Sequence, residues 1–239
     1  MKNKIVSWIR QQIKDSGAKG IVMGLSGGID SAVVAALCKE AVGRNNLLVL
    51  FMPCESNPQD LSDARLVARK LRLKSQLVDL SSVYNNFLKV LPAAGDLVRG
   101  NLKPRLRMST LYYFANKLNY LVCGTGNKSE LLVGYFTKYG DGGVDILPIA
   151  DLFKRQVRSL AQELKIPQEI INKPPTAGLW QGQTDEGEMG ITYSQLDDIL
   201  DRLCNNKKQE AGSNKVNKIK KMYKNSEHKR KGAQICRIH

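Results

Sequence analysis

The sequence predicts an α/β fold, in which a Rossmann-like parallel sheet is flanked by helices and followed by a helical C-terminal segment. Short apolar runs alternate with stretches of helical periodicity, which is typical of parallel strands joined by helices. The run at 47–52 is apolar at every position, as expected for a strand buried on both faces. The stretch 20–37 joins a strand, a Ser/Gly loop and a helix, which is the repeating unit of such folds.

Capping and stop signals place the ends of the elements. A first amphipathic helix over about 4–16 ends at Gly17. Asn57 and Pro58 are a typical N-cap and first helical residue, and Ser81 predicts a further cap. The predicted strands are 20–25, 47–52, 76–80 and 120–124, with a last extended segment at 144–149, and further helices are predicted at 29–43, 105–119, 127–135, 152–164, 194–203 and 214–225.

The Ser/Gly loop between the first strand and the second helix suits a phosphate. Such a loop offers free backbone N–H groups and the positive end of a helix dipole. Gly27 and Gly28 let the backbone approach an anion, and Ser26 and Ser31 add hydroxyl donors. The carboxylate of Asp30 would repel a phosphate unless a Mg²⁺ ion lay between them. The loop lacks the Gly-Lys-Ser/Thr ending of the Walker P-loop.

Composition and charge narrow the class of protein. The chain has 239 residues, of which 42% are hydrophobic, so it suits one large domain with a helical extension. No apolar run approaches the roughly 18 to 20 residues of a membrane span, and no signal-type stretch occurs at the N-terminus. We therefore expect a soluble cytoplasmic protein.

The positive charge is concentrated near the C-terminus. The net charge is +15, and residues 207–239 hold eleven Lys or Arg against two acids. A solvated helix face explains most such runs, and a groove for a polyanionic substrate, either nucleotide or RNA, is the alternative. Only His228 and His239 are histidines, so a His-based triad or a His-rich zinc site in the body of the chain is not expected.

Five stretches combine glycine with charged or polar side chains, and two of them, 24–31 and 124–130, follow predicted strands. The carboxyl ends of parallel strands lie at one edge of a sheet, where such folds bind ligands. The stretches are 24–31, 100–108, 124–130, 137–145 and 173–186.

The motifs in these stretches resemble a known enzyme family. The loop Ser26–Ser31 resembles the pyrophosphate loop of the ATP pyrophosphatase superfamily. Together with Phe-Thr-Lys-Tyr-Gly-Asp-Gly-Gly at 136–143 and Pro-Thr-Ala-x-Leu at 175–179, it resembles the ammonia-dependent NAD+ synthetases, over about Ile21 to Arg230. This resemblance implies adenylylation of the nicotinate carboxylate of deamido-NAD+ by ATP. Ammonia would then attack the acyl-adenylate to give NAD+ and AMP.

The resemblance also implies roles for individual residues. It makes Asp30 and Glu130 the Mg²⁺ ligands and Lys154 the lysine on the ATP phosphates. The candidate catalytic groups are Lys154 and Asp141, the latter because it lies between two glycine-bearing turns. The implied ATP contacts are Gly24, Leu25, Ser26, Gly27, Gly28, Ile29, Asp30, Ser31, Thr125, Lys154 and Thr176. The implied deamido-NAD+ contacts are Arg105, Lys138, Asp145, His228 and Lys229. Members of the family are usually homodimers.

Without the family resemblance, three of these residues also have simpler structural interpretations. Glu130 is also explained as a first-turn carboxylate favoured by the helix dipole, and Lys154 as an exposed helix lysine. Asp141 is either a carboxylate that holds ammonium and helps remove its proton, or a turn-forming Asp before Gly.

The sequence departs from the family pattern at two places, and two other functions are alternatives. Asn127-Lys128-Ser129 precedes Glu130 where many members have His-Ala-Ala, and Pro104 stands where Ala is common. A tRNA-modifying ATP pyrophosphatase of the thiolation or lysidine type is the alternative enzyme, although the chain has no Cys-x-x-Cys pair. A non-catalytic nucleotide-responsive RNA-binding protein is the alternative outside enzymes.

The whole chain, 1–239, is expected to form a single NAD+ synthetase domain. Residues 173–190 are rich in Gly, Pro and polar residues and are long for a connection. Such loops are often lids, so we expect a flexible flap that orders when nucleotides bind. The remainder, about 194–239, is expected to be a basic helical segment.

Overall fold

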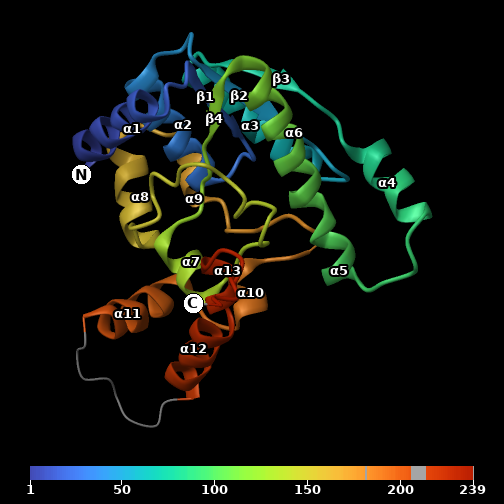
Figure 1. Cartoon of the computed structure of the whole chain (residues 1–239). Coiled ribbons are helices and arrows are strands. Elements are labelled where there is room, and N and C mark those ends of the chain that lie inside the picture. Colours follow the sequence, from blue (N-terminus) through green and yellow to red (C-terminus); the bar gives the residue numbers. More distant parts are fainter. Residues whose placement is uncertain (181, 206–213, 239) are drawn as a thin grey trace.

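A computed structural model describes residues 1–180, 182–205 and 214–238 of the chain. A four-stranded sheet of order β3-β2-β1-β4 lies at its centre, and all neighbouring strands are parallel (Figure 1). The strands are β1 (Gly20–Gly24), β2 (Leu47–Phe51), β3 (Lys74–Leu77) and β4 (Tyr120–Val122). A parallel bridge between Cys123 and Ile146 confirms the short extended segment predicted there.

Helices connect and cover the strands as the sequence pattern predicts. The helices of the described residues are α1 (Lys2–Ser16), α2 (Ile29–Val42), α3 (Pro58–Lys70), α4 (Ser81–Lys89), α5 (Asp96–Gly100), α6 (Leu102–Leu118), α7 (Lys128–Val133), α8 (Lys154–Glu163), α9 (Gln168–Asn172), α10 (Asp185–Met189), α11 (Tyr193–Cys204), α12 (Asn214–Asn225) and α13 (Glu227–Arg230).

Each face of the sheet has its own hydrophobic core. Ile21 and Met23 of β1 point into a core formed with α1, α2, α3, α8 and α9. Val22, between them in sequence, points to the opposite face and packs with residues of α4 and α6. Because both faces are buried, the central strands are apolar at almost every position. The sheet therefore forms a rigid base whose carboxyl edge carries the loops.

The C-terminal helices form a third core beside the sheet. Tyr193, Leu196 and Leu200 of α11 pack with Ile219 of α12 and Val133 of α7. Figure 1 shows α10 to α13 gathered below the sheet, next to α7. Helices are thus confirmed in the predicted C-terminal segment as far as Arg230, and they join the region that follows β4, whereas residues 231–238 are not helical. Part of the predicted basic run, Lys207 and Lys208, lies outside the described residues.

Three predicted boundaries were wrong for identifiable reasons. The strand expected at 76–80 is β3 at Lys74–Leu77, because its partner β2 ends at Phe51. Ser81 is not an N-cap; its backbone N–H donates to the carboxylate of Asp79, and the helix begins there. The helix expected from 105 begins at Leu102. Pro104 does not prevent this earlier start, because the N–H groups of a first turn have no helical partner to lose.

Candidate active site

The pyrophosphate-type loop lies between β1 and α2, as the sequence predicts. Gly27 has φ +83°, and a Cβ there would lie 2.5 Å from the carbonyl oxygen of Asp60 on α3, so this position requires glycine. The Ser31 hydroxyl donates to the carbonyl of Gly28 at 3.0 Å and lies 3.1 Å from Ser26 Oγ. No side chain caps α2, so its first-turn N–H groups are available to an anion.

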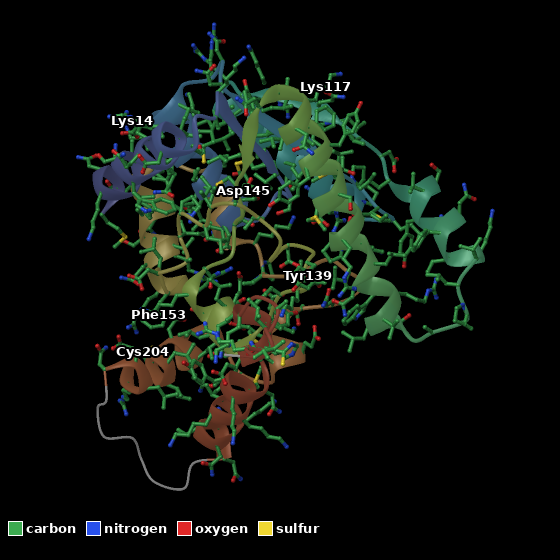
Figure 2. All side chains as sticks on the ribbon, in the orientation of Figure 1. Lys14, Lys117, Tyr139, Asp145, Phe153 and Cys204 are labelled. Carbon is green, nitrogen blue, oxygen red and sulfur yellow. The ribbon has the colours of Figure 1, made fainter. Side chains whose placement is uncertain are left out.

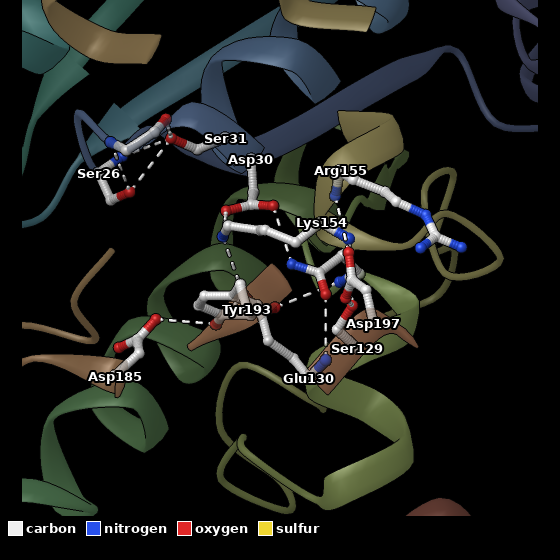
Figure 3. Close-up of polar contacts among 12 residues, drawn as sticks. Ser26, Asp30, Ser31, Ser129, Glu130, Lys154, Arg155, Asp185, Tyr193 and Asp197 are labelled. Carbon is white, nitrogen blue, oxygen red and sulfur yellow. Dashed lines mark hydrogen bonds and ion pairs between the residues drawn. The ribbon is translucent and has the colours of Figure 1, made fainter. Parts of the chain in front are cut away.

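Two carboxylates converge on one lysine beside this loop. Lys154 Nζ lies 2.5 Å from Asp30 Oδ2 and 3.4 Å from Glu130 Oε1, and only 2% of its side chain is exposed (Figure 3). The three residues come from the first turns of α2, α7 and α8. Helices from three parts of the chain therefore aim one cation and two anions at one point. The exposed-lysine interpretation of Lys154 was wrong.

Burial and charge shift the pKa values of this group in opposite ways. Burial would lower the pKa of Lys154, but Asp30 and then Glu130 together raise it above its ordinary value. Burial raises the pKa of Glu130 to about 7, although the Lys154 ammonium opposes that shift. The lysine therefore stays charged, and it is a cation that stabilises two nearby carboxylates.

Asn127 and Ser129, which depart from the pattern of the family that the sequence resembles, support this group. Asn127 forms a capping box with Glu130, which orients the carboxylate, and its amide donates to Asp30 Oδ1 at 2.9 Å. The Ser129 hydroxyl donates to Asp197 Oδ1 at 2.5 Å and accepts from the backbone N–H of Lys154. The departures therefore form the contacts that hold α7 against α2, α8 and α11.

Tyr193 and Asp185 complete the group and were not predicted. The Tyr193 hydroxyl lies 2.9 Å from Asp185 Oδ2 and 3.3 Å from Glu130 Oε1. Its ring centre lies 4.8 Å from Lys154 Nζ, within cation–π distance. Asp185 Oδ1 is buried without a hydrogen-bond partner. An aromatic residue at a helix start looks like core, so no sequence signal could have identified Tyr193.

One cleft of about 590 Å³ contains most of the predicted ATP contacts, a size typical of ligand sites. Gly27 does not line it, because that glycine faces α3. Thr176 enters from the segment before α10, where its hydroxyl donates to the carbonyl of Gln183. The predicted ATP contacts that line the cleft are Gly24, Leu25, Ser26, Gly28, Ile29, Asp30, Ser31, Thr125, Lys154 and Thr176.

Four of the five predicted deamido-NAD+ contacts lie together, mostly outside the cleft lining. Arg105 donates to the carbonyl of Lys138 at 3.5 Å, and Lys138 Nζ donates to the carbonyl of His228 at 2.5 Å. Lys229 Nζ donates to the carbonyls of Gly134 and Phe136, each at 2.8 Å. Of these four, Lys229 lines the cleft, so the short helix α13 reaches its wall.

Asp145, the fifth of these residues, belongs to a different group of contacts. Its carboxylate accepts from the Tyr112 hydroxyl at 2.9 Å and from the backbone N–H of Val122 at 2.7 Å. Figure 2 shows it nearer the sheet than Tyr139, the neighbour of Lys138. Asp145 therefore ties α6 to the end of β4 and is not part of the cleft lining.

Asp141 lines the cleft at the turn after Thr137. Its Oδ1 accepts from the Thr137 backbone N–H at 2.9 Å, as expected for a turn-forming Asp. Desolvation raises the pKa of this carboxylate, although the hydrogen bond from the Thr137 backbone and the charges of Lys229 and Arg107 oppose the shift. The turn contact is thus present, and the raised pKa also suits a group that exchanges a proton.

Two further cations line the cleft and had no predicted role. Lys173 Nζ lies 2.8 Å from Asp60 Oδ1 and 2.5 Å from Asp63 Oδ2, which ties the predicted lid to α3. Arg107, two residues after Arg105 on α6, is the second. The predicted lid is only partly irregular, because α10 (Asp185–Met189) lies within 173–190.

A family model described as NAD synthase matches residues 1–233. The NH(3)-dependent NAD(+) synthetase of Syntrophomonas wolfei is 46% identical over 243 residues, which cover 99% of this chain and 95% of the relative.

Two solved structures have the same fold. A structure of NMN synthetase from Francisella tularensis has a TM-score of 0.89 at 39% identity, covering 98% of this chain and 96% of that one. The NH3-dependent NAD synthetase from Campylobacter jejuni, in complex with nitrate ion, has a TM-score of 0.86 at 32% identity, covering 99% and 97%. Among the described residues, no helix is long and apolar enough to cross a membrane.

Proposed function

The chain belongs to the NAD synthase family, and from this we infer that it is a ligase that forms a C–N bond. The reaction is the ammonia-dependent amidation of deamido-NAD+ to NAD+. The observation that carries this function is the Asp30–Lys154–Glu130 group beside a glycine loop that suits a phosphate. ATP is the co-substrate. A tRNA-modifying activity is not favoured, because the family match covers nearly the whole chain.

The reaction proceeds in two steps. A carboxylate oxygen of the nicotinate attacks the α-phosphorus of ATP, and pyrophosphate leaves with the electrons of the broken P–O bond. The nitrogen of ammonia then attacks the acyl carbon, AMP leaves, and one proton is released. The first step joins two anions, so a site that accelerates it must hold fixed positive charge.

ATP lies with its polyphosphate along the loop from Gly24 to Ser31 in this proposal. The N–H groups at the start of α2 and the hydroxyls of Ser26 and Ser31 donate to phosphate oxygens. Lys154 adds positive charge beside them, and Thr125 and Thr176 contact the nucleotide from two other loops.

Magnesium fits the residues on one side of this group. Asp30 and Glu130 direct carboxylate oxygens toward the same cation, Lys154 Nζ. Hard carboxylate oxygens are the kind of ligand that Mg²⁺ prefers. Among the described residues, no cluster of three or more His, Cys, Asp or Glu side chains could hold a metal, so phosphate oxygens or water would supply the other ligands. Bound there, Mg²⁺ would neutralise phosphate charge.

The second substrate binds along the group formed by Arg105, Lys138, His228 and Lys229, with Asp145 as a further contact at β4. The contacts that join α6, the 137–145 loop and α13 support this assignment. Asp141, at the cleft wall, holds ammonium and accepts its proton before the attack on the adenylate.

A homodimer and a cytoplasmic location complete the proposal. Large apolar side chains are exposed on α4, on α5 and between them, and one of them, Leu97, also lines the cleft. Apolar surface of this extent marks interfaces. The exposed side chains are Val83, Phe87, Val90, Leu91, Leu97 and Val98.

A second candidate substrate is nicotinate mononucleotide, because a solved relative is named NMN synthetase. The test is an assay of the purified protein with ATP, Mg²⁺ and ammonium, and with either deamido-NAD+ or nicotinate mononucleotide. We expect equal amounts of NAD+ and AMP with deamido-NAD+ and a lower kcat/KM with the mononucleotide. Absence of both NAD+ and AMP would contradict the proposed function, and RNA binding that falls steeply with salt would then favour an RNA-binding protein.

A further inference from the structure

Arg107 is a half-buried cation without a carboxylate partner among the described contacts. Its guanidinium has five N–H donors, and two of them are used. Nε donates to the carbonyl of Met52 at 3.0 Å, and Nη2 donates to Ser56 Oγ at 3.1 Å. Burial lowers its pKa, which is the cost of holding a charge away from water. An anion that entered the cleft would offset this cost.

The two hydrogen bonds fix the direction in which the remaining donors point. Met52 and Ser56 lie in the segment that follows β2, at the carboxyl edge of the sheet. A guanidinium bonded through Nε and Nη2 cannot rotate in its plane, so its Nη1 edge is held in place. Arg107 therefore arrives at the cleft already oriented, and little side-chain entropy is lost when a ligand binds.

Arg107 lines the cleft within electrostatic reach of carboxylates on both sides of the proposed reaction. The carboxylates whose charges act on it include Asp141, on the ammonia side, and Asp60, beside the pyrophosphate loop. All three side chains line the same cleft. In the proposed function, the α-phosphate of ATP and the nicotinate carboxylate meet in this cleft.

Arg105, two residues earlier, cannot serve this purpose from its position. Residues two apart on a helix point in different directions, and Arg105 is exposed and outside the cleft lining. Its guanidinium donates to the carbonyls of Asn101 and Lys138. Of the two arginines in this turn of α6, Arg107 is the one that faces the reacting groups.

We propose that Arg107 is a catalytic residue of the first step, donating from its free edge to the non-bridging oxygens of the α-phosphoryl group while the nicotinate oxygen attacks and pyrophosphate leaves. The negative charge on those oxygens is then met by a fixed cation that needs no reorganisation. This role rests on the proposed function and adds Arg107 to Lys154 as a second cation at the reacting centre.

The experiment measures the first step alone, as exchange of labelled pyrophosphate into ATP with deamido-NAD+ and without ammonia. We expect Arg107→Ala to lower the exchange rate at saturating ATP by about 100-fold, with a KM for ATP within a few-fold of that of the unaltered protein. Millimolar methylguanidinium should restore part of this rate saturably. The control is Arg69→Ala, at an exposed position near the end of α3. This variant should leave the exchange rate unchanged and should not respond to methylguanidinium.

Arg107→Lys keeps the experiment decisive if the alanine variant does not fold. Lysine keeps the charge but not the planar fork, so we expect exchange to fall about 10-fold. Unchanged exchange in Arg107→Lys would overturn the proposal, as would a raised KM for ATP with unchanged kcat. A lower melting temperature in Arg107→Ala without rescue would mean that Arg107 only ties α6 to the β2 loop. If the unaltered protein makes no NAD+, the proposed function fails, whatever the variants do.

Discussion

At the scale of single residues, the charge of Lys154 carries two functions. In the absence of nucleotide its ammonium compensates Asp30 and Glu130, which lie 2.5 and 3.4 Å away. In the proposed reaction it faces phosphate oxygens. Removing one partner of a buried ion pair leaves uncompensated charge, which costs more than the pair itself contributes. Stability and catalysis therefore depend on the same side chain.

Lys154→Met is expected to lower the free energy of unfolding by about 3 kcal/mol, because it leaves two half-buried carboxylates without a cation. Mg²⁺ should restore more stability to this variant than to the unaltered protein, because the ion can occupy the vacated position. Thermal unfolding with and without Mg²⁺ measures both effects. The control is Lys128→Met, since Lys128 pairs with the exposed Asp151 and should cost at most about 1 kcal/mol. Equal Mg²⁺ effects in the two proteins would argue against the proposed metal site.

Asp141 predicts a distinct pH dependence. A base must be ionised to accept a proton, and burial raises the pKa of Asp141, so the step that uses ammonia should fail as pH falls through a value above the ordinary range of aspartate. Asp141→Asn should lower kcat/KM for ammonium about 100-fold and remove this acid limb, while pyrophosphate exchange is kept. The exposed carboxylate variant Asp151→Asn is the control. An unchanged dependence of rate on ammonium in Asp141→Asn would leave Asp141 with its turn-forming role alone.

At the scale of elements, the first turns of α2, α7 and α8 meet where the site lies. Residues 173–179 line the cleft at this junction and are fastened to α3 by the Lys173 ion pairs. Trp180 lies against α5, where a Cβ on Gly100 would be 3.3 Å from its ring. This part of the chain is thus held against α3 by Lys173 and against α5 by Trp180, through contacts that a nucleotide could replace.

If this segment is a lid, Trp180 should report its movement. Trp8, the other tryptophan, is 40% exposed on α1, so Trp8→Phe leaves Trp180 as the single reporter. We expect ATP with deamido-NAD+ to change its fluorescence and to slow proteolysis within 173–184. Adding Lys173→Met should increase proteolysis of the free protein, because the contact with α3 is lost. An identical signal with and without substrates would contradict a lid.

At the scale of the whole molecule, the apolar side chains of α4 and α5 predict a dimer. Figure 1 shows these helices extending away from the sheet. Val90 and Val98 are 77% and 64% exposed, which a second copy of the chain would cover. Phe87→Asp with Val98→Asp should convert a dimer to a monomer, measured by light scattering, and weaken deamido-NAD+ binding if the interface borders the cleft. A protein that is monomeric before substitution would end this hypothesis.

Much of the fold was predictable because its signals are local. Gly17 ends α1 with φ +67°, Asn57 caps α3 through the Gln59 N–H, and Pro58 begins that helix. The position of β3 was not predictable, because its four exposed residues carry no pattern and only pairing with β2 defines it. Sequence signals thus locate an element where capping or burial acts on neighbouring residues, and fail where a distant strand decides.

The sequence by itself determined the chemistry of the loops and the order of the motifs, because a glycine loop, a capping residue or a family motif is a property of neighbouring residues. Tertiary structure decided which side chains meet. Lys154 and Asp30 are 124 positions apart, and Tyr193 is 63 from Glu130. It also decided that Arg107 faces the cleft while Arg105 lies outside its lining. Such choices depend on how helices pack on the sheet, and no local pattern carries that information.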